Sequence, residues 1–139
     1  MRQASHTIIL ATRGRGLIEF TAELRRFLVD AGIRDGLLTA FCRHTSASLV
    51  IQENADPDVR ADLDAFFARL APDGDPRYRH DTEGPDDMPA HIRAALTQTS
   101  LAVPIVQGRL ALGMWQGLYL WEHRTSAHQR EVLLHLIGE

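Results

Sequence analysis

Four short apolar segments near the end of the chain constrain the fold more than any other feature. Their sequences are SLAVPIV, RLALG, QGLYLWEH and HQREVLLHLI, and glycines or a short polar stretch separate them. In the last segment Val132, Leu134 and Leu136 alternate with other residues, which is the period of a half-buried strand. No helical segment lies between these strands, so the repeated strand and helix alternation of a doubly wound fold is absent. We therefore predict a terminal antiparallel meander.

The N-terminal part of the chain contains strand patterns and one helix pattern. ASHTIILAT (residues 4–12) is rich in β-branched residues, and the RGRG that follows supplies glycines for a turn into LIEF, so a hairpin is expected. Apolar residues at 24, 27, 28 and 31 then recur with helical spacing. Thr21 is the expected cap of this helix, and Gly32 suits its left-handed end.

Two further strands and a second helix follow. Residues 37–43 and 47–53 have strand patterns on either side of a short polar turn. Asp56 before Pro57 predicts a helix start, because the aspartate accepts a free backbone N–H and proline loses no helical hydrogen bond there. Apolar residues then form one face of this helix up to Leu70.

The order of the elements predicts the fold class. A shorter helix is expected from about Pro89 to Leu96, before the terminal strands. The chain therefore runs through strands, a helix, strands, helices and strands, which favours an α+β fold with a few helices covering a mostly antiparallel sheet. The length predicts a single compact domain, residues 1–139.

Composition and charge exclude several classes of protein. The net charge of −3 and the pI near 6.1 give no general attraction to nucleic acid or to anionic membranes. All fifteen cationic side chains are arginine, which excludes lysine Schiff bases and the phosphate-binding lysine of a P-loop. Cys42 is the only cysteine, so neither an intrachain disulfide nor a CxxC zinc site can form. Without an apolar run long enough for a signal peptide or a membrane span, we expect a soluble cytoplasmic protein.

The stretch HDTEGPDDMPAH, residues 80–91, concentrates metal-competent groups in an irregular loop. His80, Glu83, Asp87 and His91 offer imidazole and carboxylate ligands for zinc, manganese or a similar ion. Only a returning loop can bring the two histidines together, because they are not one helical turn apart. The alternative is that Asp86 and Asp87 cap the following helix while the histidines are solvated.

A second polar cluster, RHTSAS at residues 43–48, lies between two predicted strands. His44 is a candidate metal ligand or acid/base group, and the hydroxyls of Thr45 and Ser46 are candidate donors to phosphate oxygens. The alternative for the hydroxyls is cross-strand hydrogen bonding. No GxSxG elbow surrounds Ser46, which disfavours a serine hydrolase triad.

Polar residues elsewhere are candidate substrate contacts. Asn54 precedes a helix N-terminus, where backbone N–H groups favour anions. Gln116, Glu122 and Arg124 fall at even offsets, on one face of a predicted strand whose middle is apolar. Arg124 is predicted either to clamp a phosphate or to form an ion pair with Glu122.

Three long motifs and the C-terminus resemble a known family. HTSASLVIQENADPDVRADL, YRHDTEGPDDMPAHIRAAL, VPIVQGRLALGMWQGLYLWEHR and the closing REVLLHLIGE are similar to the YjbQ or UPF0047 family, also called the secondary thiamine-phosphate synthase family. The resemblance runs nearly end to end. It implies a small α+β protein, a homotrimer, and weak thiamine-phosphate synthase activity that joins a pyrimidine-methyl diphosphate to a thiazole phosphate.

The resemblance also implies a polar cleft and a divalent metal ion, Mg or Zn. Its residues would be His44, Thr45, Ser46, Asn54, His80, Asp87, His91, Gln116, Glu122 and Arg124. His44, His80 and His91 are the expected metal ligands, and His44, Glu83, Asp87 and His91 the expected catalytic groups. Many family members have DGPR near the end of the last motif where this chain has EHR, so His123 inherits no role.

Two other functions use the same residues. A metal-dependent hydrolase of a phosphorylated small molecule would use the ion to make bound water more acidic. A non-enzymatic trimer would bind a small phosphorylated metabolite without turnover. All three functions require His44, His80 and His91 to converge beside the carboxylates.

Overall fold

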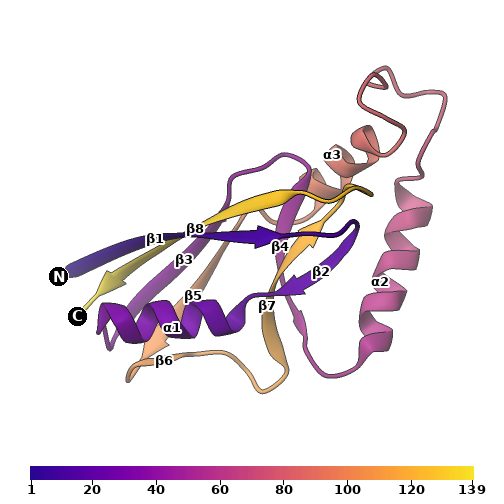
Figure 1. Ribbon diagram of the computed structural model, residues 1–139. Helices are drawn as coiled ribbons and strands as arrows, with labels where there is room; N and C mark the ends of the chain where they lie inside the picture. The colour runs from indigo at the N-terminus through magenta and orange to yellow at the C-terminus, as the bar shows by residue number, and fades with distance from the viewer.

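The strands of the protein divide between two antiparallel sheets, as the computed structural model of residues 1–139 shows (Figure 1). The strands are β1 (Arg2–Ala11), β2 (Gly16–Glu19), β3 (Gly36–Cys42), β4 (Ala47–Glu53), β5 (Ser100–Val106), β6 (Arg109–Leu110), β7 (Gln116–Glu122) and β8 (Gln129–Gly138). The helices are α1 (Thr21–Ala31), α2 (Pro57–Leu70) and α3 (Asp87–Leu96). The five-stranded sheet has the order β1-β8-β3-β5-β6, and the three-stranded sheet has the order β2-β7-β4. The predicted α+β class is confirmed.

Three predicted strand pairings, β1 with β2, β6 with β7 and β7 with β8, are wrong, because the two strands of each pair belong to different sheets. β1 pairs with β8 and β2 pairs with β7, so no hairpin joins β1 to β2. Gly14 and Gly16 between them have φ of 123° and 153°, conformations that allow a sharp change of direction. Of the predicted meander only the β5–β6 pairing exists, since β7 lies in the three-stranded sheet and β8 returns between β1 and β3. The turn signals located the strands without determining their partners.

The hydrophobic core joins one face of the five-stranded sheet to α1 and the three-stranded sheet. Val132, Leu134 and Leu136 of β8 are fully buried, as their alternation predicted. Leu24 and Leu28 of α1 belong to the same cluster of 19 buried residues. Full burial of each such side chain contributes about 2 kcal/mol. The polar loops extend from the elements that form this core.

The two ends of α1 show one confirmed and one wrong prediction. Gly32 follows the helix with φ of 63°, in the left-handed conformation expected of it. Thr21 is not the cap, because Phe20 occupies that position and no side chain caps the helix. The hydroxyl of Thr21 instead accepts the backbone N–H of Leu118 at 2.9 Å and donates to Glu19. It therefore ties α1 to β7 rather than closing the helix end.

The second helix begins as predicted but stands away from the core. Asp56 accepts the backbone N–H of Asp58 at 2.9 Å, directly before Pro57. No residue of α2 is buried, and the side of the molecule that this helix forms is visible at the right of Figure 1. The third helix begins at Asp87 rather than Pro89, so its first turn includes one of the candidate ligands.

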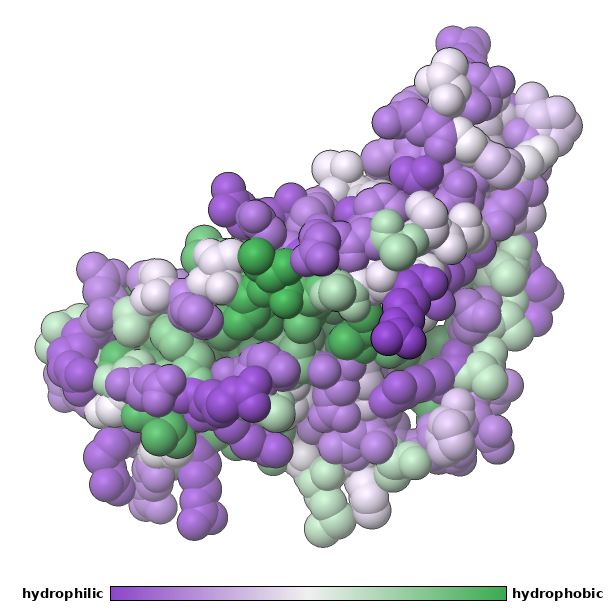
Figure 2. All heavy atoms as spheres, in the orientation of Figure 1, coloured by the Kyte–Doolittle hydropathy of each residue, from purple (hydrophilic) through white to green (hydrophobic).

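The outer face of the five-stranded sheet carries exposed apolar side chains. Leu37, Phe41 and Ile137 are 41%, 45% and 39% exposed, and Leu37 lies opposite Ile137 in the β3–β8 ladder. Figure 2 also shows hydrophobic residues at the surface over the middle of β1 and β8. No helix in the structure is both long enough and apolar enough to cross a bilayer.

Candidate functional site

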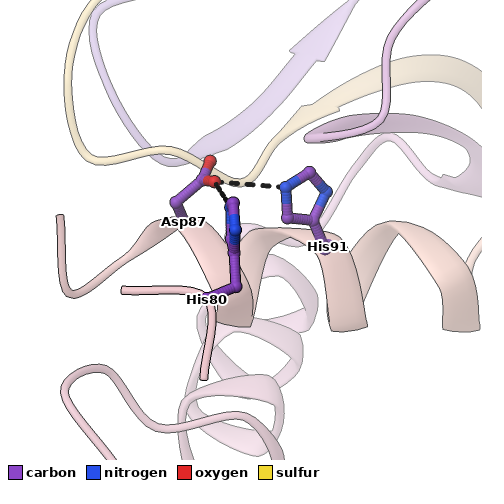
Figure 3. A group of neighbouring side chains, drawn as sticks. All are labelled: His80, Asp87 and His91. Atoms are coloured by element: carbon purple, nitrogen blue, oxygen red, sulfur yellow. Dashed lines mark hydrogen bonds and ion pairs between the residues drawn. The ribbon is translucent and has the colours of Figure 1, made fainter. Parts of the chain in front are cut away.

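The segment between α2 and α3 projects from the sheets, and its end with the first turns of α3 forms the acidic stretch of residues 80–91. Figure 1 shows it as the tip beyond both helices, and Figure 2 shows that this end of the molecule is hydrophilic. Gly84, with φ of 105°, turns the chain toward α3. His80 thereby lies beside the first turn of α3, next to Asp87 and His91 (Figure 3).

His80, Asp87 and His91 point one ligand atom each toward a common place (Figure 3). Nε2 of His80 lies 2.6 Å from Oδ2 of Asp87, and Nε2 of His91 lies 3.1 Å from the same oxygen. The three atoms all lie within 4.8 Å of one another. Asp87 and His91 are one helical turn apart, so α3 alone places them on one face, whereas His80 depends on the returning loop.

The ring of His91 is held so that an unprotonated nitrogen faces the carboxylate. Its Nδ1 lies 2.9 Å from the backbone oxygen of Thr45, and because a carbonyl oxygen only accepts, Nδ1 must carry a hydrogen. In a neutral ring Nε2 then has only a lone pair, which points at Oδ2 of Asp87, a second acceptor. Two facing acceptors repel each other unless a proton or a metal ion lies between them.

The ligand atoms match the donor set of a transition metal ion. Ligands about 2.0 Å from a tetrahedral zinc ion lie about 3.3 Å apart, close to the 3.1 Å between His91 and Asp87. His80 and Asp87, now 2.6 Å apart in a hydrogen bond, would have to separate by less than an ångström to admit the ion. Imidazole favours zinc and its neighbours, whereas magnesium prefers oxygen ligands alone. Metal-bound histidines also donate their other N–H to a carbonyl or carboxylate, as His91 donates to Thr45. His80, Asp87 and His91 therefore fit zinc better than magnesium.

Arg124, directly after β7, binds the acidic loop from the other side. Its Nη1 lies 2.7 Å from Oδ1 of Asp87, and its Nε donates to Oδ2 of Asp86 at 2.9 Å. Its Nη2 donates to the backbone oxygen of Glu83. The guanidinium is thus occupied by this loop, and neither a phosphate clamp nor an ion pair with the side chain of Glu122 describes it. Arg124 positions Asp87 in the cluster.

The two aspartates at the start of α3 are held ionised. Burial opposes ionisation of Asp86, but hydrogen bonds from Thr125 and Arg124 keep its pKa well below the usual range. Burial also opposes ionisation of Asp87, and the hydrogen bond from His80 with the charge of Arg124 lowers its pKa. Asp86 occupies the cap position of α3 without making a side-chain cap hydrogen bond, so simple helix capping does not explain it.

Glu83 lies on the solvent side of the cluster. Its Oε2 is 3.0 Å from Nε2 of His80, and its side chain is 62% exposed, against 4% for Asp87. The hydrogen bond to Asp87 raises the pKa of His80, so a proton and a metal ion compete for the same nitrogen. Glu83 is the exposed carboxylate beside the cluster.

His44 does not join this cluster, so the expected convergence of three imidazoles is corrected to two. Its Nε2 accepts the backbone N–H of Glu131 at 2.7 Å, and its Nδ1 faces Nη1 of Arg130 at 3.4 Å. Both ring nitrogens are engaged away from His80 and His91. Burial, together with the charge of Arg130, lowers the pKa of His44. Within this chain His44 is therefore a neutral ring outside the His80–Asp87–His91 cluster.

A buried ion pair between Glu122 and Arg130 lies behind the turn at residues 43–46. Glu122 is fully buried and accepts from Nε of Arg130 at 2.8 Å and from the hydroxyl of Thr12 at 2.6 Å. Burial opposes its ionisation, yet these hydrogen bonds lower the pKa of Glu122. The partner of Glu122 is thus Arg130 and not Arg124, and Glu122 does not reach an open surface.

Thr45 and Ser46 line a hollow that adjoins His80, Asp87 and His91. The other lining residues are Phe41, Cys42, Arg43, His44, Thr99 and Arg130. Because the backbone oxygen of Thr45 binds His91, one turn of the chain forms the wall of both the hollow and the cluster. The hydroxyls of Thr45 and Ser46 therefore lie next to His80, Asp87 and His91.

Asn54 and Gln116 lie at the opposite end of the three-stranded sheet. In the β4–β7 ladder Glu53 pairs with Gln116, whereas Ala47 pairs with Glu122. The seven residues of β7 separate these ends by about 20 Å. Gln116 accepts the backbone N–H of Gly113 in its own loop. A single chain therefore does not bring Asn54 or Gln116 to the His80–Asp87–His91 cluster.

Comparison with known proteins identifies the family. The family profile described as UPF0047 protein YjbQ-like matches residues 6–139. A UPF0047 protein of Synechocystis sp. is 57% identical over 138 residues, which cover 99% of this chain and 94% of the relative. The chain belongs to the YjbQ/UPF0047 family. YjbQ of Escherichia coli O157:H7 is 43% identical over 134 residues, 96% of each chain.

Solved structures share the YjbQ-like fold. A YjbQ/UPF0047-family crystal structure from Clostridium acetobutylicum has a TM-score of 0.84 at 33% identity, covering 96% of this chain and 99% of that one. A conserved hypothetical protein from Thermus thermophilus has a TM-score of 0.85 at 34% identity, covering 95% and 99%. This chain therefore has the same overall fold as these YjbQ-like solved structures.

In this YjbQ-like chain, sequence reasoning missed Arg130, which lines the hollow, and the buried ring of His123 behind it. Arg130 falls in phase with Val132, Leu134 and Leu136, the buried positions of β8, and it is itself only 4% exposed. A cation in phase with buried apolar residues indicates a buried ion pair, which was the available signal. His123 is fully buried with Nε2 2.8 Å from the hydroxyl of Ser48, and no local pattern marked it.

Proposed function

We propose that this protein is a metal-dependent enzyme that acts on a phosphorylated small molecule. The observation that carries this proposal is the pair of facing acceptors, Nε2 of His91 and Oδ2 of Asp87, beside Nε2 of His80. A buried carboxylate that faces the lone pair of His91 and lies beside a second imidazole favours a cation between them. The preferred ion is zinc or a similar transition metal, with His80, Asp87 and His91 as its ligands.

Three protein ligands leave room for a substrate atom. Catalytic zinc sites have three protein ligands and an open position, whereas structural sites use four. A divalent ion held here would neutralise phosphate charge and make a coordinated water molecule more acidic. Arg124 holds the carboxylate of Asp87, and the backbone oxygen of Thr45 holds the ring of His91, without a bound ligand.

The first candidate reaction is thiamine-phosphate synthesis, which the family resemblance implies. A thiazole nitrogen attacks the methylene carbon of the pyrimidine-methyl diphosphate, the carbon–oxygen bond breaks, and pyrophosphate leaves with the bonding electrons. The chain must hold phosphate oxygens and orient the two rings, and it needs no nucleophile of its own. Thr45 and Ser46 supply hydroxyl donors beside the cluster, and Glu83 is placed to exchange protons at its rim.

Hydrolysis of a phosphorylated metabolite is the second candidate, and the ligand set favours it specifically. Two imidazoles and one carboxylate resemble the ligands of zinc hydrolases, where the open position serves a water molecule. The same cluster would then act with Glu83 as the neighbouring proton acceptor.

Metal analysis of the protein purified without added ions tests the site. We expect bound zinc or a similar ion in the wild type and its loss in the His80→Ala, His91→Ala double variant. His6→Ala is the matched control, because His6 is exposed on β1 and stacks on Phe27 away from the cluster. Equal metal content in all three proteins would show that the cluster holds no ion.

An activity assay then separates the candidate functions. Thiamine phosphate formed from both substrates, abolished in the double variant and retained in the His6→Ala control, would support the synthase. Release of inorganic phosphate from phosphoesters with the same variant pattern would favour the hydrolase. Thermal stabilisation by phosphorylated ligands without turnover would point to the non-enzymatic alternative.

The proposed assembly is a homotrimer, in which further copies of this chain cover the outer face of the five-stranded sheet. Leu37, Phe41 and Ile137 on that face are too apolar to be ordinary surface residues, and adjacent exposed apolar side chains mark protein interfaces. Light scattering on a sizing column would show a trimer for the wild type. Phe41→Glu would reduce its mass, and Val29→Glu would not, since Val29 is an exposed residue of α1.

A further inference from the structure

The hydrogen positions at His44 follow from its partners. The backbone N–H of Glu131 is a donor only, and it lies 2.7 Å from Nε2 of His44, so Nε2 is an acceptor without a hydrogen. A neutral imidazole carries one hydrogen, which must then be on Nδ1. Nδ1 of His44 is therefore a donor, and it points at Nη1 of Arg130 from 3.4 Å.

Arg130 brings a second donor to the same place. Glu122 accepts from its Nε and Nη2, and Ser46 accepts from Nη2 through both its hydroxyl and its backbone oxygen. Its Nη1 has no partner other than Nδ1 of His44. Since a guanidinium never accepts, two N–H groups face each other with no acceptor between them. This is the reverse of the metal cluster, where two acceptors face each other.

These donors open into the hollow described above. The hollow has a volume of about 540 Å³, within the range of pockets for small molecules, and its other polar side chains are Arg43 and the hydroxyl-bearing Thr45, Ser46 and Thr99. The nearby cations are paired, Arg130 with Glu122 and Arg43 with Glu131, so the hollow attracts ligands through oriented hydrogens rather than through net charge. Fixed donors of this kind recognise the oxygens of a phosphoryl group.

We propose that the hollow is an oxyanion site in which Nδ1–H of His44 and Nη1–H of Arg130 donate to one oxygen of a phosphoryl group. The hydroxyl of Ser46, which accepts from Arg130, has its own hydrogen free for a second oxygen. His44 is thus a phosphate donor instead of a metal ligand. The inference deepens the proposed function, because it names the phosphoryl group by which the substrate is held. That this phosphoryl group belongs to a substrate rests on the proposed function.

The position of the hollow fits a molecule that reaches from one site to the other. Thr45 lines the hollow and its backbone oxygen holds His91, so the two sites share a single turn of the chain. A phosphate anchored on His44 and Arg130 would place the rest of a small metabolite beside the metal cluster. Removing the anchor would then raise KM without removing the metal.

Phosphate titration of the metal-free, full-length protein tests the oxyanion site apart from the metal. Inorganic phosphate and pyrophosphate are added while calorimetry measures binding and nitrogen-15 NMR of the histidine rings follows His44. We expect saturable binding, a protonated Nδ1 in His44, and a shift of that nitrogen on titration. His44→Ala and Ser46→Ala should each weaken phosphate binding about tenfold, the loss of one hydrogen bond to a charged group.

Arg130 requires a conservative variant, because removing it would leave the buried carboxylate of Glu122 without a cation. Arg130→Lys keeps the charge for Glu122 and lacks the second guanidinium nitrogen, so it should fold and bind phosphate weakly. The His80→Ala, His91→Ala variant should keep full phosphate affinity in metal-free protein, while His44→Ala should keep its metal.

Three results would contradict the oxyanion site while leaving the proposed metal-dependent function open. Absence of saturable phosphate binding to the metal-free wild type, unchanged affinity in His44→Ala, or a proton on Nε2 of His44 would each show that the hollow is no oxyanion site. Loss of metal and turnover in the double variant would still support the metal-dependent function.

Discussion

Replacing His123 by glutamine removes a buried imidazole whose environment opposes protonation. The ring is fully buried at the end of β7, with Nε2 2.8 Å from the hydroxyl of Ser48 and no partner for Nδ1. Burial first, and then the charge of Arg93, lowers the pKa of His123 to about 3. The other charged groups that act on it are Glu122, Arg15 and Arg130. A glutamine amide can replace the hydrogen bond to Ser48 without titrating.

The size of the effect follows from the difference between the folded and unfolded pKa. Unfolded His123 takes up a proton as pH falls through 6.5, whereas the folded ring stays neutral down to about pH 3. The unfolded chain then binds more protons, so the free energy of unfolding falls as the solution is acidified. One pKa unit corresponds to about 1.4 kcal/mol, so this ring alone removes about 3 kcal/mol between pH 7 and pH 4.

Urea unfolding at pH 7 and pH 4, at a single protein concentration, measures this effect. Ionised carboxylates such as Asp86 and Glu122 also lose stabilisation in acid, so the informative quantity is the wild type compared with His123→Gln. We expect the loss of unfolding free energy between the two pH values to be about 3 kcal/mol smaller in the variant. His6→Gln, at an exposed histidine, should behave as the wild type. Equal pH dependence in His123→Gln and the wild type would refute the reasoning.

Three further perturbations test the site and the fold. Asp87→Asn should weaken zinc binding at least tenfold by calorimetry. The zinc affinity of the wild type should decrease as the pH is lowered, because a proton on His80 competes with the ion. Gly36→Ala should cost about 2 kcal/mol or more in thermal unfolding, since the added Cβ would meet the backbone oxygen of Ile137 at 2.1 Å. Asp56→Ala should cost about 1 kcal/mol, because the cap on the N–H of Asp58 is lost; unchanged unfolding would contradict the assignment of the cap.

Short-range sequence patterns predicted which helices and strands form more accurately than they predicted how each helix begins. The alternation at Val132, Leu134 and Leu136 located β8 and its buried face, and Asp56 with Pro57 located the start of α2. Both features act within a few residues, through the pleat of a strand and the free N–H groups of a helix. Thr21 shows the limit, because its hydroxyl found Leu118, 97 positions away, in place of the helix end.

The candidate site was predicted in composition and only partly in arrangement. The sequence grouped His80, Glu83, Asp87 and His91 in one stretch, but the pairing of Asp87 with His91 on one helix face appeared only with the earlier start of α3. The sequence did not show that His44 would accept a backbone N–H from Glu131, since that contact requires β8 to lie beside β3. It also did not assign Arg124 to the acidic loop, because β7 and α3 are distant in the chain.

The sequence by itself therefore determined which segments become strands and helices, the buried face of β8, and which residue types could bind a metal ion. Only the tertiary structure decided the partners: β1 with β8, Glu122 with Arg130, and His80 with Asp87 and His91. The physical reason is the sequence separation over which each interaction acts. Backbone conformation and burial period are set by neighbours within a few residues, whereas each of these contacts forms between distant segments that meet only when the whole core packs.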